Sequence, residues 1–500
     1  MSQSVPAPRP GATGERPDTH RWLVLAIVSI AQLMIVLDVT IMNIALPSAQ
    51  HDLGFSNDLR QWIVTAYSLS FGSLLLVGGR LSDIVGRKTT FIIGLVGFAA
   101  ASAFGGAAQN FAMLATGRAI QGLFAALLAP AALSLLSTTF SGSGDRPKAF
   151  AIFGAVVGSG AAIGLLLGGA LTEYLDWRWC LYVNMLFAVI ALIGAIVLLP
   201  GGRVQDRPSI DLPGTITAVA GLFCVVYGLS NAETHSWSAP QTWAFLAAGA
   251  VILVVFVLAE ARVRHPLLPL HIPGDRNRGG CYLAVFITGA GMFGCFLFLT
   301  YYLQNTLGYS PVKTGLAFLP LVAGIMLAAQ LSTIVLLPRI GPQLPVAIGM
   351  LLGAGGMAWL AGIGVQGNYP GQVLPQIILV GVGMGFVIAP AMNVATMGVA
   401  PSDAGVASAT VNTAQQVGGS IGVALLSSVA TDAAARFLTG KAPTKLLAAQ
   451  SALHGYTTAF WWSAAIFAAG AVICGLLLRP GKISTAAASG SEAESVSVMT

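Results

Sequence analysis

Apolar segments long enough to cross a bilayer make up most of this chain. A search for runs of about 18 to 25 apolar residues, broken by charged residues or by Pro/Gly clusters, gives fourteen of them. Only 8% of the residues are charged and 56% are hydrophobic, whereas a soluble domain carries about 25% charged residues. This composition excludes a soluble enzyme, a disordered scaffold and a receptor with a single membrane anchor. The expected spans are 22–46, 61–79, 90–108, 111–137, 149–172, 179–199, 210–231, 242–261, 280–304, 311–337, 344–365, 373–397, 404–430 and 456–478.

The distribution of basic residues predicts the orientation of these spans. An even number of spans puts both termini on one side of the membrane. With both termini in the cytoplasm, 17 Lys and Arg residues fall in inner segments and six in outer segments, while Arg118 lies within a span. Such an excess on the inner side is typical of membrane proteins. We therefore expect a multi-pass protein of the bacterial inner (cytoplasmic) membrane with both termini cytoplasmic.

An internal repeat divides the chain into two halves. Gly86 matches Gly341 at an offset of 255 residues, and the string LAPA from Leu128 recurs as IAPA from Ile388 at an offset of 260. Duplicated bundles around a central site are a transporter architecture. We expect an all-α integral membrane protein with the following parts: a disordered tail 1–20, an N-terminal six-helix bundle 21–200, two inserted membrane helices 201–265, a C-terminal six-helix bundle 266–480 and a disordered tail 481–500.

Two charged residues lie well inside apolar runs. Apart from acids at helix ends such as Asp211 and Glu260, Asp38 in LDVTIMNIALP is the one acidic residue inside a run, and Arg118 is the sole basic residue well inside one. Charged groups at membrane depth are costly and usually functional, and a carboxylate that must become neutral in apolar surroundings is a natural proton site. We expect the two to pair and to handle protons. The alternatives are that Asp38 hydrogen-bonds locally with Thr40 and Asn43, and that Arg118 caps helix carbonyls.

The segment between the second and third spans carries charges and tight-turn glycines. It contains Gly79, Asp83, Gly86, Arg87 and Lys88. We predict that it forms a gating loop that latches the two halves. A merely solvated loop that sets the topology is the alternative.

The fifth span is rich in glycine. Small residues at repeated helical spacing allow helices to approach closely and to slide. Glycines alone do not distinguish sliding from simple packing. The residues in question are Gly154, Gly158, Gly164, Gly168 and Gly169.

No motif predicts a cofactor, a metal or a nucleic acid. The string GAGMFG (Gly289–Gly294) fits a dinucleotide pattern but lies in the middle of an apolar run, without the strand–turn–helix context that gives the pattern meaning. The chain has no phosphate-binding GxxxxGK[ST] motif, and its basic residues are not clustered as nucleic-acid binding requires. Transport energy is therefore expected from an ion gradient or from a partner.

The motifs together resemble those of the major facilitator superfamily, and in particular its fourteen-helix drug:proton antiporter branch. The resemblance rests on the Gly79–Lys88 segment, on the fourth span with Arg118 and Pro130, and on the strings LDVTIMNIALP, IDLPGTITAVAGL, PLLPL, YLQNTLGYSPVKTGLAFLP and VNTAQQVGGSIGVA. One departure is Leu165 after Gly164, where the family's antiporter motif usually carries proline. The resemblance implies proton-coupled efflux of hydrophobic drugs or antibiotics by alternating access, in which Asp38 binds the proton and Arg118 modulates it.

The leading hypothesis is thus a proton-coupled drug or antibiotic exporter that acts as a monomer and conveys resistance. An exporter of one endogenous metabolite, lipid precursor or siderophore is the alternative, and a sensor or scaffold that has lost transport is a third. Aromatic and Met residues such as Phe71, Met292, Phe296 and Met326 are candidates for the pocket wall. The candidate polar residues of the substrate cavity are Asn43, Gln121, Tyr301, Gln304, Asn412 and Gln416.

Overall fold

The structure, a computed structural model, describes residues 18–140, 145–199, 211–235, 237–263, 266–397, 399, 404–439 and 444–481. The described residues form helices and no strands. The tails expected to be disordered fall outside this part, except for residues 18–20 and 481. The helices are α1 Asp18–Leu53, α2 Asn57–Val85, α3 Arg87–Gly106, α4 Phe111–Thr139, α5 Arg146–Tyr174, α6 Trp179–Leu198, α7 Leu212–His235, α8 Pro240–Glu260, α9 His271–Gly274, α10 Arg276–Tyr301, α11 Pro311–Leu331, α12 Leu337–Ile340, α13 Gln343–Leu360, α14 Tyr369–Gln372, α15 Leu374–Thr396, α16 Ala404–Leu438 and α17 Lys445–Leu477.

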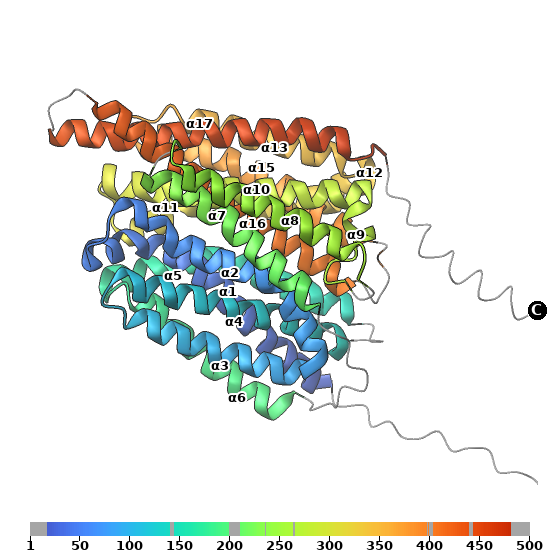
Figure 1. Cartoon of the computed structure of the whole chain (residues 1–500). Coiled ribbons are helices and arrows are strands. Elements are labelled where there is room, and N and C mark those ends of the chain that lie inside the picture. Colours follow the sequence, from blue (N-terminus) through green and yellow to red (C-terminus); the bar gives the residue numbers. More distant parts are fainter. Residues whose placement is uncertain are drawn as a thin grey trace, which may run out of the picture.

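The helices form two bundles that lie side by side with their long axes roughly parallel (Figure 1). Helices α1–α6 make the first bundle, and the second contains α10, α11, α13, α15, α16 and α17. The bundles meet along two seams, where α2 packs against α16 and α5 packs against α11. Helices α7 and α8 pair with each other, and α7 also packs on both α2 and α16. The inserted pair therefore covers one seam from outside.

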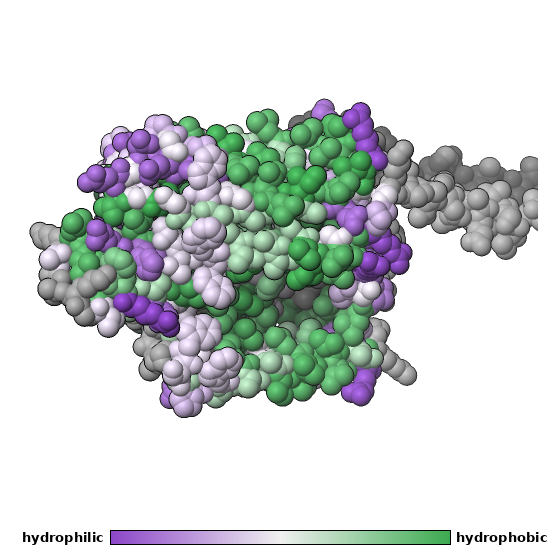
Figure 2. All heavy atoms as spheres, turned by 90° about the horizontal axis from the view of Figure 1, so that it is seen from above, coloured by the Kyte–Doolittle hydropathy of each residue, from purple (hydrophilic) through white to green (hydrophobic). Residues whose placement is uncertain are grey.

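The outer surface of the bundle matches a bilayer. Hydrophobic atoms form a broad band between two hydrophilic edges (Figure 2). Twelve helices of the described part are long and apolar enough to cross a membrane. Two more, α2 and α7, are 29 and 24 residues long but are not among those twelve. The chain is thus a multi-pass membrane protein, and the count of fourteen spans stays a prediction.

Polar side chains cap the N-termini of several helices. The side chain of Asn110 accepts a hydrogen bond of 2.9 Å from Met113 N at the start of α4, and Asp275 accepts one of 2.9 Å from Arg278 N in α10. Ser310 and Thr444 cap α11 and α17 in the same way. These caps satisfy backbone donors that the first helical turn leaves without partners.

Two segments are more helical than the sequence predicted. Residues 431–454 lie between the expected spans 404–430 and 456–478, but α16 continues to Leu438 and α17 already begins at Lys445. These helices have 35 and 33 residues, which exceeds the length needed to cross a hydrocarbon core. Similarly, the expected loop between the second and third spans is a single residue, Gly86, between α2 and α3. Its φ of 101° is readily adopted only by glycine.

Candidate functional site

A buried ion pair lies inside the N-terminal bundle. Asp38 of α1 and Arg118 of α4 are 1% and 2% exposed, and Arg118 Nη1 lies 2.5 Å from Asp38 Oδ2. The expected contact between these two residues is therefore present. Helices α1 and α4 pack against each other. Both charges therefore lie at a buried contact between two long apolar helices.

Amide side chains of α4 and α6 complete the shell of Asp38. Gln121 Nε2 and Asn184 Nδ2 donate hydrogen bonds of 3.0 and 2.7 Å to Asp38 Oδ1. Gln121 also donates to Ser102 Oγ at 2.7 Å and accepts from Arg118 at 3.0 Å. Both carboxylate oxygens thus accept from other helices, and the local bonding to Thr40 and Asn43 that was the alternative does not occur; Thr40 bonds the carbonyls of Val36 and Leu37.

The remaining contacts of Arg118 hold its guanidinium in place. Its Nε donates to Ile63 O at 3.4 Å, and its Cζ lies 4.4 Å from the centre of the Tyr67 ring. Arg118 therefore does bond one helix carbonyl, but one that belongs to α2 inside the bundle. Three N–H groups thus converge on one carboxylate in the apolar interior, and they join α1 to α4 and α6.

Ser102, Asn184 and Tyr67 belong to this cluster, and sequence reasoning missed them. Asn184 is fully buried and is the sole amide in the run 179–199. An amide alone in an apolar run was the available signal, since such a group requires a buried partner. The Tyr67 hydroxyl is buried and has no hydrogen-bond partner in the described part of the chain.

The glycines of α5 lie at two different contacts. A side chain at Gly168 would come within 2.9 Å of Ile41 Cα in α1, whereas one at Gly169 would come within 2.8 Å of Pro311 O at the start of α11. Gly164 lies against Thr40. Gly154 has open space around it, and Gly158 lies in the same helix with its surroundings outside the described part. The close approaches thus gather at the C-terminal half of α5.

The residues of the predicted gating loop lie at the junction of α2 and α3. Gly79 and Asp83 belong to the last turns of α2, and the side chain of Asp83 is outside the described part. Arg87 and Lys88 start α3. Lys88 Nζ donates hydrogen bonds of 3.0 and 2.7 Å to the carbonyls of Ile196 and Leu199 at the end of α6. Lys88 thus caps a helix of its own bundle, where cations are favoured.

The six candidate cavity residues do not come together. Gln121 belongs to the Asp38 cluster, and Asn43 is buried in the same helix as Asp38. Gln304 donates to Ile44 O at 3.1 Å across the two bundles, and Tyr301 lies beneath Arg60, also across the bundles. Asn412 and Gln416 are half-buried on α16, where Gln416 faces Gly72 of α2. The set therefore spreads along the contact between the bundles.

Contacts between the bundles gather at the end that lies away from both termini. Besides the Gln304–Ile44 bond, Val312 N donates to Glu173 Oε2 at 2.9 Å. At the other end, Arg276 donates to the carbonyls of Leu476 and Leu477 within its own bundle. The structure thus has the seam closed at the end that holds residues 44–60, 165–173 and 301–315.

A second pair of buried acids lies at the inserted helices. Asp211 precedes α7 and Glu260 ends α8, and they are 7% and 3% exposed. Asp211 Oδ1 accepts from Gly214 N and Glu260 Oε2 accepts from Leu268 N, each at 2.8 Å. The other two oxygens both face the Gly214 α-carbon and have no hydrogen-bond donor in the described part. Sequence reasoning dismissed both residues as helix ends.

Comparison with known proteins identifies relatives along nearly the whole chain. The puromycin resistance protein pur8 of Streptomyces alboniger is 47% identical over 473 residues, which is 94% of each chain. The cephamycin export protein CmcT of Amycolatopsis lactamdurans is 38% identical over 85% of this chain and 87% of its own. The tetracenomycin C resistance and export protein of Streptomyces glaucescens is 34% identical over 81% and 75%.

Solved structures share the same fold. A peptide transporter POT bound to sulfate superposes with a TM-score of 0.64 at 16% identity and covers 94% of this chain and 97% of its own. The human organic anion transporter MFSD10 gives a TM-score of 0.59 at 16% identity, with 93% and 100% covered. The profile of the Major Facilitator Superfamily matches residues 28–423. The profile match and the relatives above 30% identity agree with the fold of two bundles, and the chain therefore belongs to the major facilitator superfamily of membrane transporters and is not an enzyme.

Proposed function

We propose that this protein exports drugs or antibiotics across the cytoplasmic membrane in exchange for protons. The single observation that carries the proposal is the buried Asp38–Arg118 pair, held by three N–H donors in an otherwise apolar bundle. Relatives named for resistance to or export of puromycin, cephamycin and tetracenomycin C support the substrate class. The protein is expected to act as a monomer with both termini in the cytoplasm.

Protonation of Asp38 is the proposed coupling step. In the ionised state the carboxylate neutralises Arg118 and accepts from Gln121 and Asn184. A proton on Asp38 removes this charge and leaves Arg118 with the weaker acceptors Gln121 Oε1 and Ile63 O. The helices α1, α2 and α4 that carry these groups would then repack, because a buried unpaired guanidinium is strongly unfavourable. Alternating access would follow from that repacking.

The seam contacts support a conformation that is closed on the outer side. With both termini in the cytoplasm, the joined residues 44–60 and 301–315 lie on the outer face. A substrate would then enter from the cytoplasm or the inner leaflet. Opening would require α5 and α11 to separate where Gly169 and Pro311 touch. This is the alternation that exporters of this architecture need.

One coupled proton sets a limit on the gradient. A charge that crosses 100 mV contributes about 2.3 kcal/mol, and one pH unit contributes about 1.4 kcal/mol. At roughly 150 mV and about half a pH unit, one proton exchanged for one neutral molecule supplies about 4 kcal/mol, which supports a gradient on the order of a thousandfold. Exchange for a monovalent cation would be electroneutral and would support roughly threefold. The single pair therefore favours neutral or zwitterionic substrates.

The test is a susceptibility panel in a host that lacks its own pumps, combined with efflux from energised vesicles. The wild type should raise resistance, and Asp38→Asn should not. Asp432→Asn is a matched control, since Asp432 is an exposed acid paired with Arg436 on the surface. Loss of resistance in both variants, or in neither, would contradict the coupling role of Asp38. Resistance to one compound only would favour the alternative of a narrow endogenous substrate.

The electrical step has its own test. Valinomycin and potassium collapse the membrane potential while the pH gradient is held. Strong inhibition of efflux supports the electrogenic exchange of a proton for a neutral molecule. Unchanged efflux of a cationic dye would show that the stoichiometry or the substrate charge differs from this proposal.

A further inference from the structure

A cavity lies at the closed end of the seam between the two bundles. It measures about 100 Å³ and is lined by α2 from the N-terminal bundle and by α10, α16 and α17 from the C-terminal bundle. Its polar wall includes Arg60, Gln61, Ser427 and Thr431, and its aromatic wall includes Tyr301 and Tyr456. The cavity is separate from the Asp38 cluster, none of whose residues lines it. Neither bundle forms it alone.

Arg60 enters this cavity as a buried cation without a counter-charge. The residue is 9% exposed, and among the described residues no carboxylate forms an ion pair with it. Its Cζ lies 3.2 Å from the centre of the Tyr301 ring, and its Nη1 donates one hydrogen bond of 3.2 Å to Gln50 Oε1. A guanidinium has five N–H donors in one plane. The ring covers one face, and the remaining in-plane donors are available to an acceptor in the cavity.

Gln61 adds a second donor without an acceptor. It is 2% exposed, and its Nε2 has no hydrogen-bond partner in the described part of the chain. A buried amide NH₂ without a partner costs free energy that a native site recovers through a ligand or water. Arg60 thus presents charged donors to the cavity, and Gln61 lines it with an amide whose Nε2 gains a partner there when the side chain turns toward a bound group. The wall is complementary to a group with negative charge and several lone pairs.

The size of the cavity decides how large that group is. Sites that enclose drug-sized molecules measure about 300 to 1,000 Å³, so this cavity does not hold a whole antibiotic in the closed seam. A carboxylate group or a halide ion fits. We infer that the cavity binds one small monovalent anion, of the size of a carboxylate group, between Arg60 and Gln61 of one bundle and the α10–α16–α17 wall of the other.

The position of the anion between the bundles links its binding to the conformation of the transporter. Its binding groups come from both bundles, and the Arg60–Tyr301 contact crosses the seam. Opening of the seam divides the site, so the anion binds the closed arrangement better than the open one. A ligand with this preference shifts the population toward the closed arrangement. The anion therefore stabilises the closed conformation of this end of the transporter, and its release favours opening.

Thermal unfolding of the purified full-length protein in nanodiscs tests the inference without any transport substrate. Sodium acetate is compared with sodium gluconate at the same concentration, since both carry a carboxylate but gluconate is too large for the cavity. Acetate should raise the unfolding temperature saturably, by roughly 1 to 3 °C at tenfold excess over its Kd. Arg60→Gln and Gln61→Leu should abolish the difference. Arg436→Gln, a change in an exposed arginine of α16, should keep it.

A further variant tests the site by filling it. Gln61→Glu places a carboxylate of the same shape beside Arg60. It should unfold in gluconate at the temperature that wild type reaches in acetate, and it should no longer respond to acetate. Equal unfolding temperatures of the wild type in acetate and gluconate would overturn the inference. So would an acetate effect that is undiminished in both Arg60→Gln and Gln61→Leu.

Efflux measurements distinguish two sources of the anion. If an exported molecule places its carboxylate on Arg60 while the seam is open, Arg60→Gln should lower export of carboxyfluorescein several-fold more than export of ethidium. If the anion comes from the outer medium, Arg60→Gln should change the export of both dyes by the same factor, or carboxyfluorescein should not be exported at all. Because the unfolding assay contains no transport substrate, its result stands whether or not the protein proves to be proton-coupled.

Discussion

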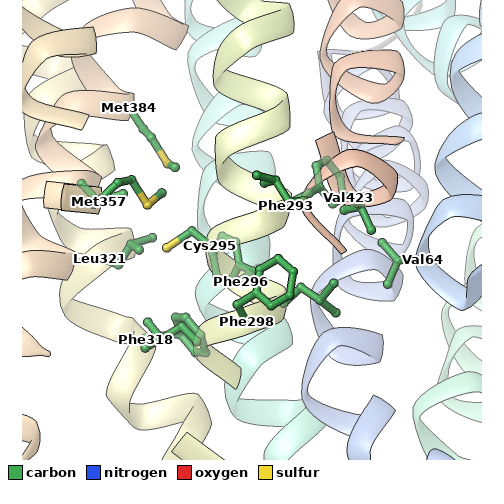
Figure 3. Packing of buried hydrophobic residues seen from close by; sticks show 14 of the residues in the cluster. Val64, Phe293, Cys295, Phe296, Phe298, Phe318, Leu321, Met357, Met384 and Val423 are labelled. Atoms are coloured by element: carbon green, nitrogen blue, oxygen red, sulfur yellow. The ribbon is translucent and has the colours of Figure 1, made fainter. Parts of the chain in front are cut away.

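The two bundles share a fold but have opposite interiors. The N-terminal bundle buries Asp38 together with the guanidinium of Arg118 and the amides of Gln121 and Asn184. At the 260-residue repeat offset, Arg118 corresponds to Ile378 and Gln121 to Gly381. The C-terminal interior is instead packed with side chains such as Cys295, Phe318, Met357 and Met384 (Figure 3). Duplication thus supplied the scaffold twice, whereas among the described residues of the two bundles only the N-terminal copy buries an ion pair. With the proton coupling proposed above, coupling would belong to one half, and the other half would be its apolar counterpart.

The largest effect is expected at Asp38. Asp38→Asn keeps the shape of the side chain but leaves Arg118 buried without a counter-charge, which should cost about 3 to 5 kcal/mol of stability and abolish proton-coupled efflux. Acidification or alkalinisation of vesicles on drug addition measures the coupling, and thermal unfolding measures the stability. The matched change in the other interior is Met384→Leu, which should cost less than about 1.5 kcal/mol and retain efflux. Equal losses in the two variants would break the comparison between the bundles.

Removal of both charges sharpens the same comparison. The double variant Asp38→Asn/Arg118→Gln makes the N-terminal interior neutral, like its counterpart. It should regain most of the stability lost by Asp38→Asn alone, because the remaining buried charge is gone, yet it should stay inactive in vesicle efflux. Recovery of efflux together with stability would mean that the pair is structural.

The contact between the bundles is the next most sensitive feature. Gly169→Val places a side chain against Pro311 O, which lies 2.8 Å from the position of a Cβ atom. The seam should then fail to close at this end, and efflux should fall at least tenfold. Gly154→Val lies in the same helix with open space around it and should change efflux little. An active Gly169→Val would show that close approach of α5 and α11 is not required.

The sequence predicted much of this architecture because periodicity and charge are local signals. Apolar runs gave the long helices, and Asp38 and Arg118 were found because charge in such a run is conspicuous. Asn184, Ser102 and Tyr67 were missed because uncharged polar residues in apolar runs are common, and only tertiary packing shows which of them share a partner. The cavity at Arg60 was missed for a similar reason. Arg60 looks like an ordinary loop cation until the second bundle is seen to bury it.

Helix ends were the least predictable feature. The segment 431–454 contains charges and polar residues that suggested a loop, but Ser451 is 3% exposed and donates to Ala434 O at 2.7 Å. Packing of α16 on α17 therefore carries both helices past the expected membrane boundary. Because Ser451 is buried, labelling of an engineered cysteine from outside the cell should use the exposed position Thr439 to test the expected orientation of the termini.

Matched glycines in the two halves provide a smaller effect. Gly86 and Gly341 both have positive φ, 101° and 74°, at positions related by the 255-residue offset. An alanine at such a φ costs about 1 to 2 kcal/mol. A Cβ atom at Gly341 would also meet the carbonyl oxygen of Gly481, so Gly341→Ala should lower the unfolding temperature more than Gly86→Ala. If Gly86 acts in switching, Gly86→Ala should nevertheless reduce efflux more. The opposite order in efflux would argue against a gating role for the α2–α3 junction.

The smallest effect is expected at Asp211 and Glu260, and it tests whether buried acids outside the N-terminal bundle take part in coupled efflux. Asp211 Oδ2 and Glu260 Oε1 both lie beside Gly214, and neither has a donor among the described residues. In Glu260→Gln the amide oxygen keeps the bond to Leu268 N, and the new NH₂ donates to Asp211. A hydrogen bond to a charged group is worth about 1.5 to 3 kcal/mol, and we expect a gain near the lower end because the pair lies at a helix boundary. Thermal unfolding at pH 8 measures the gain, and Glu260→Ala, which loses the Leu268 bond, should be less stable than wild type. Efflux should be unchanged in Glu260→Gln. A loss of coupled efflux in this variant would mean that the inserted helices carry a second proton-binding group, and coupling would then no longer be a property of one bundle.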